Sequence, residues 1–161
     1  MDKNDILRGT GFMQDTELLF VYGTLRRSAR CVMARWLSSQ GEYLGSGVIP
    51  GRLYDVGSYP ALCPARHPGE TVIGDLYRLY RPGFALARLD RYEGIGSGQS
   101  RPYQYCRGQV RVTMDDGRHL KAWAYLYRGA MVRLRRIVGG DYLQDGGPVQ
   151  TRPVKVRRGD R

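Results

Sequence analysis

Short apolar runs separated by glycine, proline and polar residues recur along the chain. The first run, Glu17–Tyr22, is aromatic and aliphatic and ends at a glycine, which predicts a buried strand. Gly23–Arg27 is then the loop that leaves this strand. Apolar residues at helical spacing over Ala29–Ser38 predict a short helix that ends near Gly41.

The middle of the chain is extended but often interrupted. Tyr43–Val56 contains glycines and a proline, which predict two short strands with a kink between them. Ser58–Pro64 has prolines within it and at its end and predicts an irregular segment, and His67–Gly69 predicts a turn. Thr71–Tyr80 alternates in polarity, which predicts another strand with polar interruptions on both faces.

A second helix is predicted over Arg81–Gly94. Pro82 suits the first helical position, and Gly94 supplies a C-terminal stop. Ile95–Pro102 follows as a glycine-rich loop.

The remaining pattern predicts a hairpin and a tail. Tyr103–Met114 and Arg118–Tyr127 are strands, because Asp115-Asp116-Gly117 between them is a strong hairpin signal. Val132–Ile137 is basic and of uncertain type, and Thr151–Arg161 is predicted to be a flexible tail after one domain over residues 1–150. Because strands dominate without regular strand–helix alternation, we expect an α+β fold. Its core is a small mixed, mainly antiparallel β-barrel with a few short helices.

Composition supports an ordinary folded domain. Of 161 residues, 42% are hydrophobic, and 22 glycines with 12 tyrosines favour turns and strands over a helical bundle. Three scattered cysteines, Cys31, Cys63 and Cys106, do not suit a disulfide framework, so we expect a reducing compartment, the cytoplasm. The absence of a signal-like or membrane-length apolar stretch predicts no membrane association.

The net charge of +11 is unevenly distributed. Residues 118–161 hold 11 basic and 3 acidic side chains. Such a section can be a solvated, solubilising tail, or it can contact nucleic acid or an anionic surface. No nucleic-acid-binding motif accompanies the charge, so we expect no nucleic-acid partner.

Most common catalytic sites are absent from the sequence. His67 and His119 have no Cys or His at metal-ligand spacing, and neither a nucleophile elbow nor a Walker loop is present. We therefore expect no metal site. The glycines that follow the second helix favour a mobile loop over a nucleotide-binding loop, which would follow a strand.

Two segments remain as candidates for chemistry. Gly23 directly follows a predicted buried strand, so backbone N–H groups in the turn can converge on an anion or a carbonyl oxygen. An ordinary strand-to-loop turn is the simpler interpretation. Glu93 places a carboxylate at a helix C-terminus, where negative charge is unfavourable. It is either a solvated side chain or a general acid–base group whose pKa the helix terminus and burial would raise.

Taken together, ordered segments between Leu18 and Tyr127 resemble the γ-glutamylcyclotransferase-like, or AIG2-like, family. The segments that carry the resemblance are VYGTLR at 21–26, GRLYDVGSYPAL at 51–62, VIGDLYRL at 72–79, LDRYEG at 89–94, residues 103–112, and AWAYLY at 122–127.

The resemblance implies the γ-glutamylcyclotransferase-like fold and an enzyme that acts on a small γ-glutamyl substrate. The α-amine of that substrate would attack its own γ-carbonyl, giving 5-oxoproline and a free amine or peptide. Glu93 matches the family's general acid–base group. The backbone of Gly23, Thr24 and Leu25 matches the loop that cradles the γ-glutamyl portion, with Tyr22 beside it. No cofactor is implied.

Some residues depart from the family pattern. Ser28-Ala29-Arg30-Cys31 stand where the family often has a glycine, which affects the distal substrate contacts. The alternative is therefore a catalytically inactive small-molecule-binding or regulatory module of the same fold. Tyr105 and Arg107 match a Tyr–Arg pattern of the family or form a cross-strand structural pair. The leaving amine and the oligomeric state are not predicted.

Overall fold

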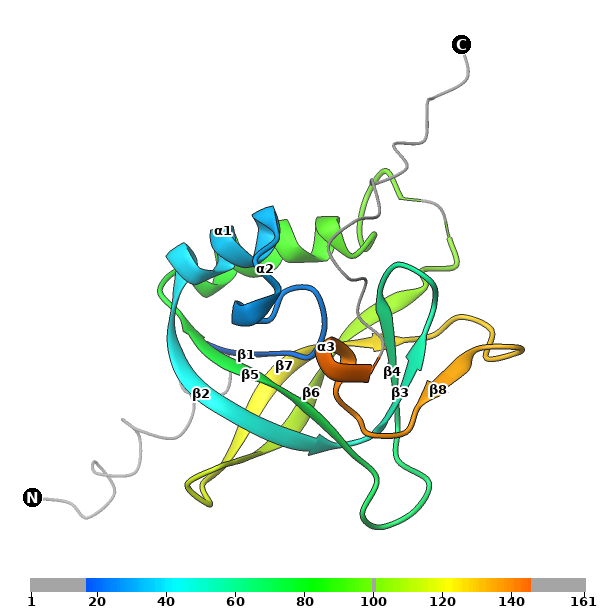
Figure 1. Ribbon diagram of the computed structural model, residues 1–161. Helices are drawn as coiled ribbons and strands as arrows, with labels where there is room; N and C mark the ends of the chain where they lie inside the picture. The colour runs from blue at the N-terminus through cyan, green and yellow to red at the C-terminus, as the bar shows by residue number, and fades with distance from the viewer. Residues whose placement is uncertain (1–16, 100, 146–161) are drawn as a thin grey trace, which may run out of the picture.

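The computed structural model describes residues 17–99 and 101–145. Five strands form a closed barrel (Figure 1). Neighbouring strands are antiparallel, except that β1 and β7 run parallel where they close the barrel. The predicted small, mixed, mainly antiparallel barrel is therefore confirmed. In order around the barrel, the strands are β1 (Leu18–Val21), β5 (Thr71–Leu79), β2 (Gly41–Pro50), β6 (Tyr105–Met114) and β7 (His119–Tyr127).

The first strand is buried on both faces, as its uninterrupted apolar run predicts. Leu18, Phe20 and Tyr22 belong to the core cluster within the barrel. Leu19 and Val21, which alternate with them, belong to a second cluster beneath the helices. The residues that lead out of β1 are therefore packed against the barrel core on one side and against the cluster beneath the helices on the other.

Two helices lie side by side on the outside of the barrel (Figure 1): α1 (Val32–Gln40) and α2 (Pro82–Tyr92). A 3-10 turn, η1 (Arg27–Ala29), precedes α1. The helix predicted over Ala29–Ser38 begins later, because the Cys31 sulfur accepts the N–H of Ala34 and caps the helix at 3.3 Å. The second predicted helix is confirmed, and Gly94 follows it with φ +78°.

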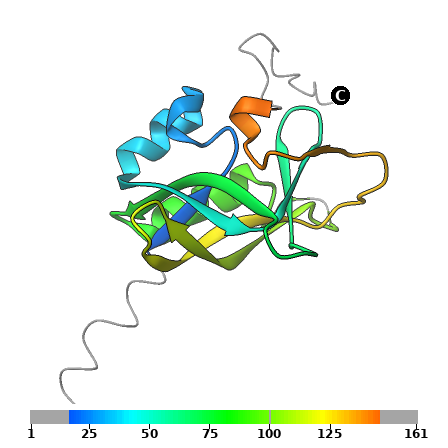
Figure 2. The same cartoon turned by 60° about the horizontal axis from the view of Figure 1, so that its bottom comes forward.

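A smaller sheet stands beside the barrel (Figures 1 and 2) and has the order β4-β3-β8. Its strands are β3 (Arg52–Asp55), β4 (Pro60–Cys63) and β8 (Arg135–Ile137). The irregular segment predicted over Ser58–Pro64 is wrong, because most of it forms β4. Proline is tolerated at the start of an edge strand, and Pro60 begins β4 opposite Asp55.

The two strands predicted within Tyr43–Val56 are confirmed as β2 and β3, which are separated at Gly51. The last element, α3 (Tyr142–Asp145), has no counterpart among the predicted elements. It is capped by Asp141, whose carboxylate accepts the N–H groups of Leu143 and Gln144 at 3.1 and 3.4 Å. The tail predicted over 151–161 lies outside the described residues.

All three cysteines are free thiols, and the cytoplasmic location predicted from their number stays a prediction. In the part of the chain that the structure describes, no helix combines the length and the apolar character needed to cross a bilayer. In the same residues, no cluster of three or more His, Cys, Asp or Glu side chains could hold a metal ion.

Candidate active site

The turn that leaves β1 is tight and closely packed. The carbonyl of Gly23 accepts the N–H of Arg26 at 3.0 Å. A Cβ added to Gly23 would lie 2.5 Å from Cγ and 2.8 Å from Cδ of Pro60. Only glycine therefore fits at this point, where the turn meets the first residue of β4.

The turn also presents backbone donors. Among residues 17–99 and 101–145, no hydrogen bond is formed by the N–H of Gly23, Thr24 or Leu25, whereas the next two N–H groups are bonded. Gly23 and Leu25 are buried. Successive backbone N–H groups without protein acceptors can bind an anion or stabilise a developing oxyanion.

A buried ion-pair network fixes the end of this turn. Arg26 is 9% exposed. Its Nη1 lies 2.9 Å from Asp141 Oδ1, and its Nε lies 3.5 Å from Asp75 Oδ1. Buried ion pairs contribute little net stability but can specify one arrangement. Here the network joins the turn to β5 and to the residue that caps α3.

Glu93 lies directly after the last turn of α2. Its backbone N–H donates to the Leu89 carbonyl at 2.8 Å, and its side chain is half-buried. Burial raises the pKa of its carboxyl to about 7, and no hydrogen bond from a described residue offsets this effect. A carboxyl with this pKa can both accept and donate a proton at neutral pH.

Three buried tyrosines lie within electrostatic reach of the Glu93 carboxylate. Burial raises the pKa of Tyr22, Tyr105 and Tyr125, and the negative charge of Glu93 adds to each shift, so the carboxylate lies near all three. Their hydroxyls bond to other groups. Tyr22 donates to the Tyr125 carbonyl, and Tyr105 donates to the Pro60 carbonyl at 2.9 Å.

The structure thus places Glu93 beside Tyr22, the residue that leads into the Gly23–Leu25 turn. Thr24 lies near Tyr92, the last residue of α2, since its side chain lowers the pKa of the Tyr92 hydroxyl while burial raises it. The predicted site residues, which are 71 positions apart at their most distant, therefore gather at one end of the barrel.

Asp90 attaches the end of α2 to the barrel. Its carboxylate accepts the Tyr125 hydroxyl at 2.7 Å and lies 3.2 Å from Arg107 Nε. Arg107 also lies over the Trp123 ring, 4.8 Å from its centroid. The interpretation of Tyr105 and Arg107 as cross-strand structural residues is confirmed, because each packs against an aromatic side chain of β7, and Arg107 in addition pairs with α2.

Sequence reasoning missed the roles of Asp90 and Tyr125. The hairpin predicted around Asp115–Gly117 could have indicated these roles, because its register sets Arg107 opposite Tyr125. An arginine and a tyrosine on the face of a hairpin that a helix covers predict an acidic partner on that helix.

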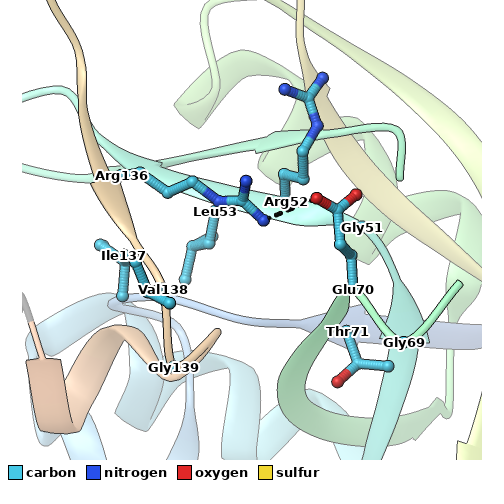
Figure 3. A pocket seen from close by; sticks show the side chains of 10 residues that line it. All are labelled: Gly51, Arg52, Leu53, Gly69, Glu70, Thr71, Arg136, Ile137, Val138 and Gly139. Carbon is cyan, nitrogen blue, oxygen red and sulfur yellow. Dashed lines mark hydrogen bonds and ion pairs between the residues drawn. The ribbon is translucent and has the colours of Figure 1, made fainter. Parts of the chain in front are cut away.

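A separate hollow of about 350 Å³ opens at the small sheet (Figure 3). Glu70 points toward Arg136 there, with Oε1 2.9 Å from Nη2. Hydrogen bonds from the N–H groups of Arg66 and His67, with those from Arg136, lower the pKa of Glu70 to about 2. Arg52 donates to the Pro64 carbonyl at 2.9 Å. Neither Glu93 nor the Gly23–Leu25 turn lines this hollow.

The chain is similar to known proteins in both sequence and fold. The family model described as "Gamma-glutamyl cyclotransferase, AIG2-like" matches residues 19–144. The chain is 29% identical over 126 residues to the gamma-glutamylcyclotransferase family protein YtfP of Escherichia coli, covering 78% of this chain and 95% of YtfP.

Solved structures agree with this assignment. The solution structure of E. coli YtfP has a TM-score of 0.56 at 29% identity, over 79% of this chain and 96% of YtfP. An AIG2-like protein from Mus musculus shares the fold with a TM-score of 0.63 at 23% identity, over 88% of this chain and 98% of the mouse chain. With a family match that extends over residues 19–144, the chain belongs to the gamma-glutamyl cyclotransferase, AIG2-like family.

Proposed function

We propose that the chain is an enzyme that cyclises a γ-glutamyl amine or peptide to 5-oxoproline and releases the amine, with Glu93 as the general acid–base group. The observation that carries the proposal is the position of the Glu93 carboxyl, which lies beside Tyr22 and has a pKa that burial raises to about 7. Family membership supports cyclotransferase chemistry in general.

The proposed reaction needs one group that both takes and gives a proton. The Glu93 carboxylate takes a proton from the substrate's α-ammonium, and the freed amine forms a bond to the γ-carbonyl carbon. The protonated carboxyl then gives its proton to the leaving nitrogen as the old carbon–nitrogen bond breaks. The new ring nitrogen loses its extra proton to the released amine, so atoms and charges balance.

The second requirement of the reaction is a group that stabilises negative charge, and the turn after β1 can supply it. As the new bond forms, negative charge develops on the γ-carbonyl oxygen. The N–H groups of Gly23, Thr24 and Leu25 form no hydrogen bonds to described residues and can stabilise this charge. One such donor is typically worth about 3 kcal/mol in a transition state. Tyr22 anchors the turn, because its hydroxyl is bonded to the Tyr125 carbonyl.

The experiment is an assay for 5-oxoproline with a panel of γ-glutamyl amines and peptides. We expect release from at least one member of the panel, with kcat/KM rising with pH through about 7 as Glu93 loses its proton. Glu93→Gln should slow release by about 10³-fold. Tight binding of panel members without any 5-oxoproline would instead favour an inactive binding module.

A further inference from the structure

Tyr142, the first residue of α3, carries a buried hydroxyl without a partner. The residue is 0% exposed, and no described residue forms a hydrogen bond with its hydroxyl. Leaving a buried hydroxyl unbonded typically costs about 1–3 kcal/mol. Such groups in folded proteins therefore require an explanation, and ligand binding is one.

The Tyr142 side chain stands against the turn of the candidate site. Its Cδ1 lies 3.8 Å from the position that a Cβ on Gly23 would occupy. It also lies close enough to Tyr105 to raise the pKa of that hydroxyl, as Glu93 does. Burial, with a smaller effect of Asp55, raises the pKa of Tyr142 itself to about 12. Its hydroxyl therefore keeps its proton at neutral pH and can act as a donor.

The position of Tyr142 is coupled to the turn through charge. Asp141 caps α3 and also pairs with Arg26 at 2.9 Å. The same carboxylate thus orients the helix that carries Tyr142 and the arginine that ends the turn. α3 and the end of the turn are therefore joined by one ion pair.

We propose that Tyr142 is a further substrate-binding residue, whose hydroxyl donates a hydrogen bond to a carboxylate oxygen of the bound γ-glutamyl group. The inference rests on the proposed function and extends it to a residue outside the signature segments. A small carboxylate suits the position, because it offers an acceptor to a donor that no described residue satisfies. The Tyr142 ring lies against Gly23, whose N–H group forms no hydrogen bond with a described residue.

The test is Tyr142→Phe, which removes only the hydroxyl. Because that hydroxyl bonds to no described residue, the free energy of unfolding should stay the same or increase. The KM for a γ-glutamyl substrate should rise about tenfold with kcat nearly unchanged, as expected when a contact made equally in the ground and transition states is lost. The matched control is Tyr80→Phe, at a 68% exposed tyrosine, which should alter neither quantity.

Calorimetric titration with 5-oxoproline separates this inference from the proposed function. If wild type turns over substrate and Tyr142→Phe keeps the wild-type KM, the inference is overturned and the function stands. If wild type binds 5-oxoproline without turning over any panel member, and Tyr142→Phe weakens Kd about tenfold, the inference stands and the function fails. A less stable Tyr142→Phe protein, or a wild type that neither binds nor reacts, overturns the inference.

Discussion

Two glutamates, Glu93 and Glu70, show how differently one side chain behaves in two surroundings within the same protein. Glu70 accepts backbone N–H groups and pairs with Arg136, and these bonds lower its pKa to about 2. Glu93 has no such donors among the described residues, and burial raises its pKa to about 7. The same carboxyl is thus ionised at neutral pH in one place and keeps its proton up to about pH 7 in the other.

The comparison teaches that the volume of a hollow is a poor marker of chemistry. The hollow at the small sheet holds about 350 Å³, but its Glu70–Arg136 pair and Arg52 are already bonded within the protein. By contrast, the N–H groups of the Gly23–Leu25 turn and the Tyr142 hydroxyl form no hydrogen bond with any described residue. Unsatisfied buried groups are costly, and we infer that substrate binding explains them.

The largest expected effect separates the two glutamates directly. Glu93→Gln should lower kcat by about 10³-fold, since the amide cannot transfer the proton. Glu70→Gln, the matched control, should leave kcat unchanged because its hollow takes no part in the reaction. Rates of 5-oxoproline release measure both. Equal losses of kcat in the two variants would show that the two glutamates do not differ in their effect on the reaction.

The second effect concerns stability against pH. The folded pKa of Glu93 lies above its unfolded value, so the native state binds more protons than the unfolded chain between about pH 4.5 and 7. This contribution is fully present below pH 4.5 and is lost as pH rises through 7. Over that range, wild type should lose about 3 kcal/mol of stability relative to Glu93→Gln.

Denaturant unfolding of the two proteins at pH 4.5 and pH 8 measures this difference. Glu70 has the opposite shift and titrates below this window, so Glu70→Gln should keep the slope of the wild-type protein. A constant gap between wild type and Glu93→Gln would show that the Glu93 carboxyl is solvated.

The third effect tests the close packing of Gly23 against the Pro60 ring. Gly23→Ala should destabilise the protein by about 1–3 kcal/mol and lower activity, because the added Cβ meets the Pro60 ring at 2.5 Å. The control is Gly83→Ala in α2, where a Cβ meets nothing within 4 Å. Alanine there should be neutral or stabilising by up to about 1 kcal/mol. Thermal unfolding compares the two, and equal melting temperatures would contradict the packing at Gly23.

The smallest effect concerns the attachment of α2. Asp90→Asn weakens the bonds to Tyr125 and Arg107 and should cost about 1–2 kcal/mol of stability. It should lower kcat about tenfold, because the end of α2 positions Glu93. Asp116→Asn weakens an exposed pair with Arg118 and should cost less than about 0.5 kcal/mol. Unchanged kcat in Asp90→Asn would show that the position of Glu93 does not depend on the contacts of Asp90 with Tyr125 and Arg107.

Local signals in the sequence predicted most of the barrel and pointed to Glu93 and the Gly23–Leu25 turn as candidate site residues, which stay a prediction. The β1 run, the proline and glycine that bound α2, and the Asp115–Gly117 turn each act within a few residues of their position. The small sheet was harder to predict, because β3 pairs with β8 across about 80 residues and nothing near Arg135 indicates that pairing. The short α3 depends on Asp141, whose second partner, Arg26, lies at the other end of the described chain.

The same Arg26–Asp141 contact, which spans 115 positions, has a consequence for biosynthesis. A ribosome must have released almost the whole domain before the arginine can meet its C-terminal partner. Until then the arginine has only Asp75 beside it, and Tyr142 has not yet reached the turn. The candidate site should therefore be completed late in folding, and a chain that stops before Asp141 should form a barrel in which this site is incomplete.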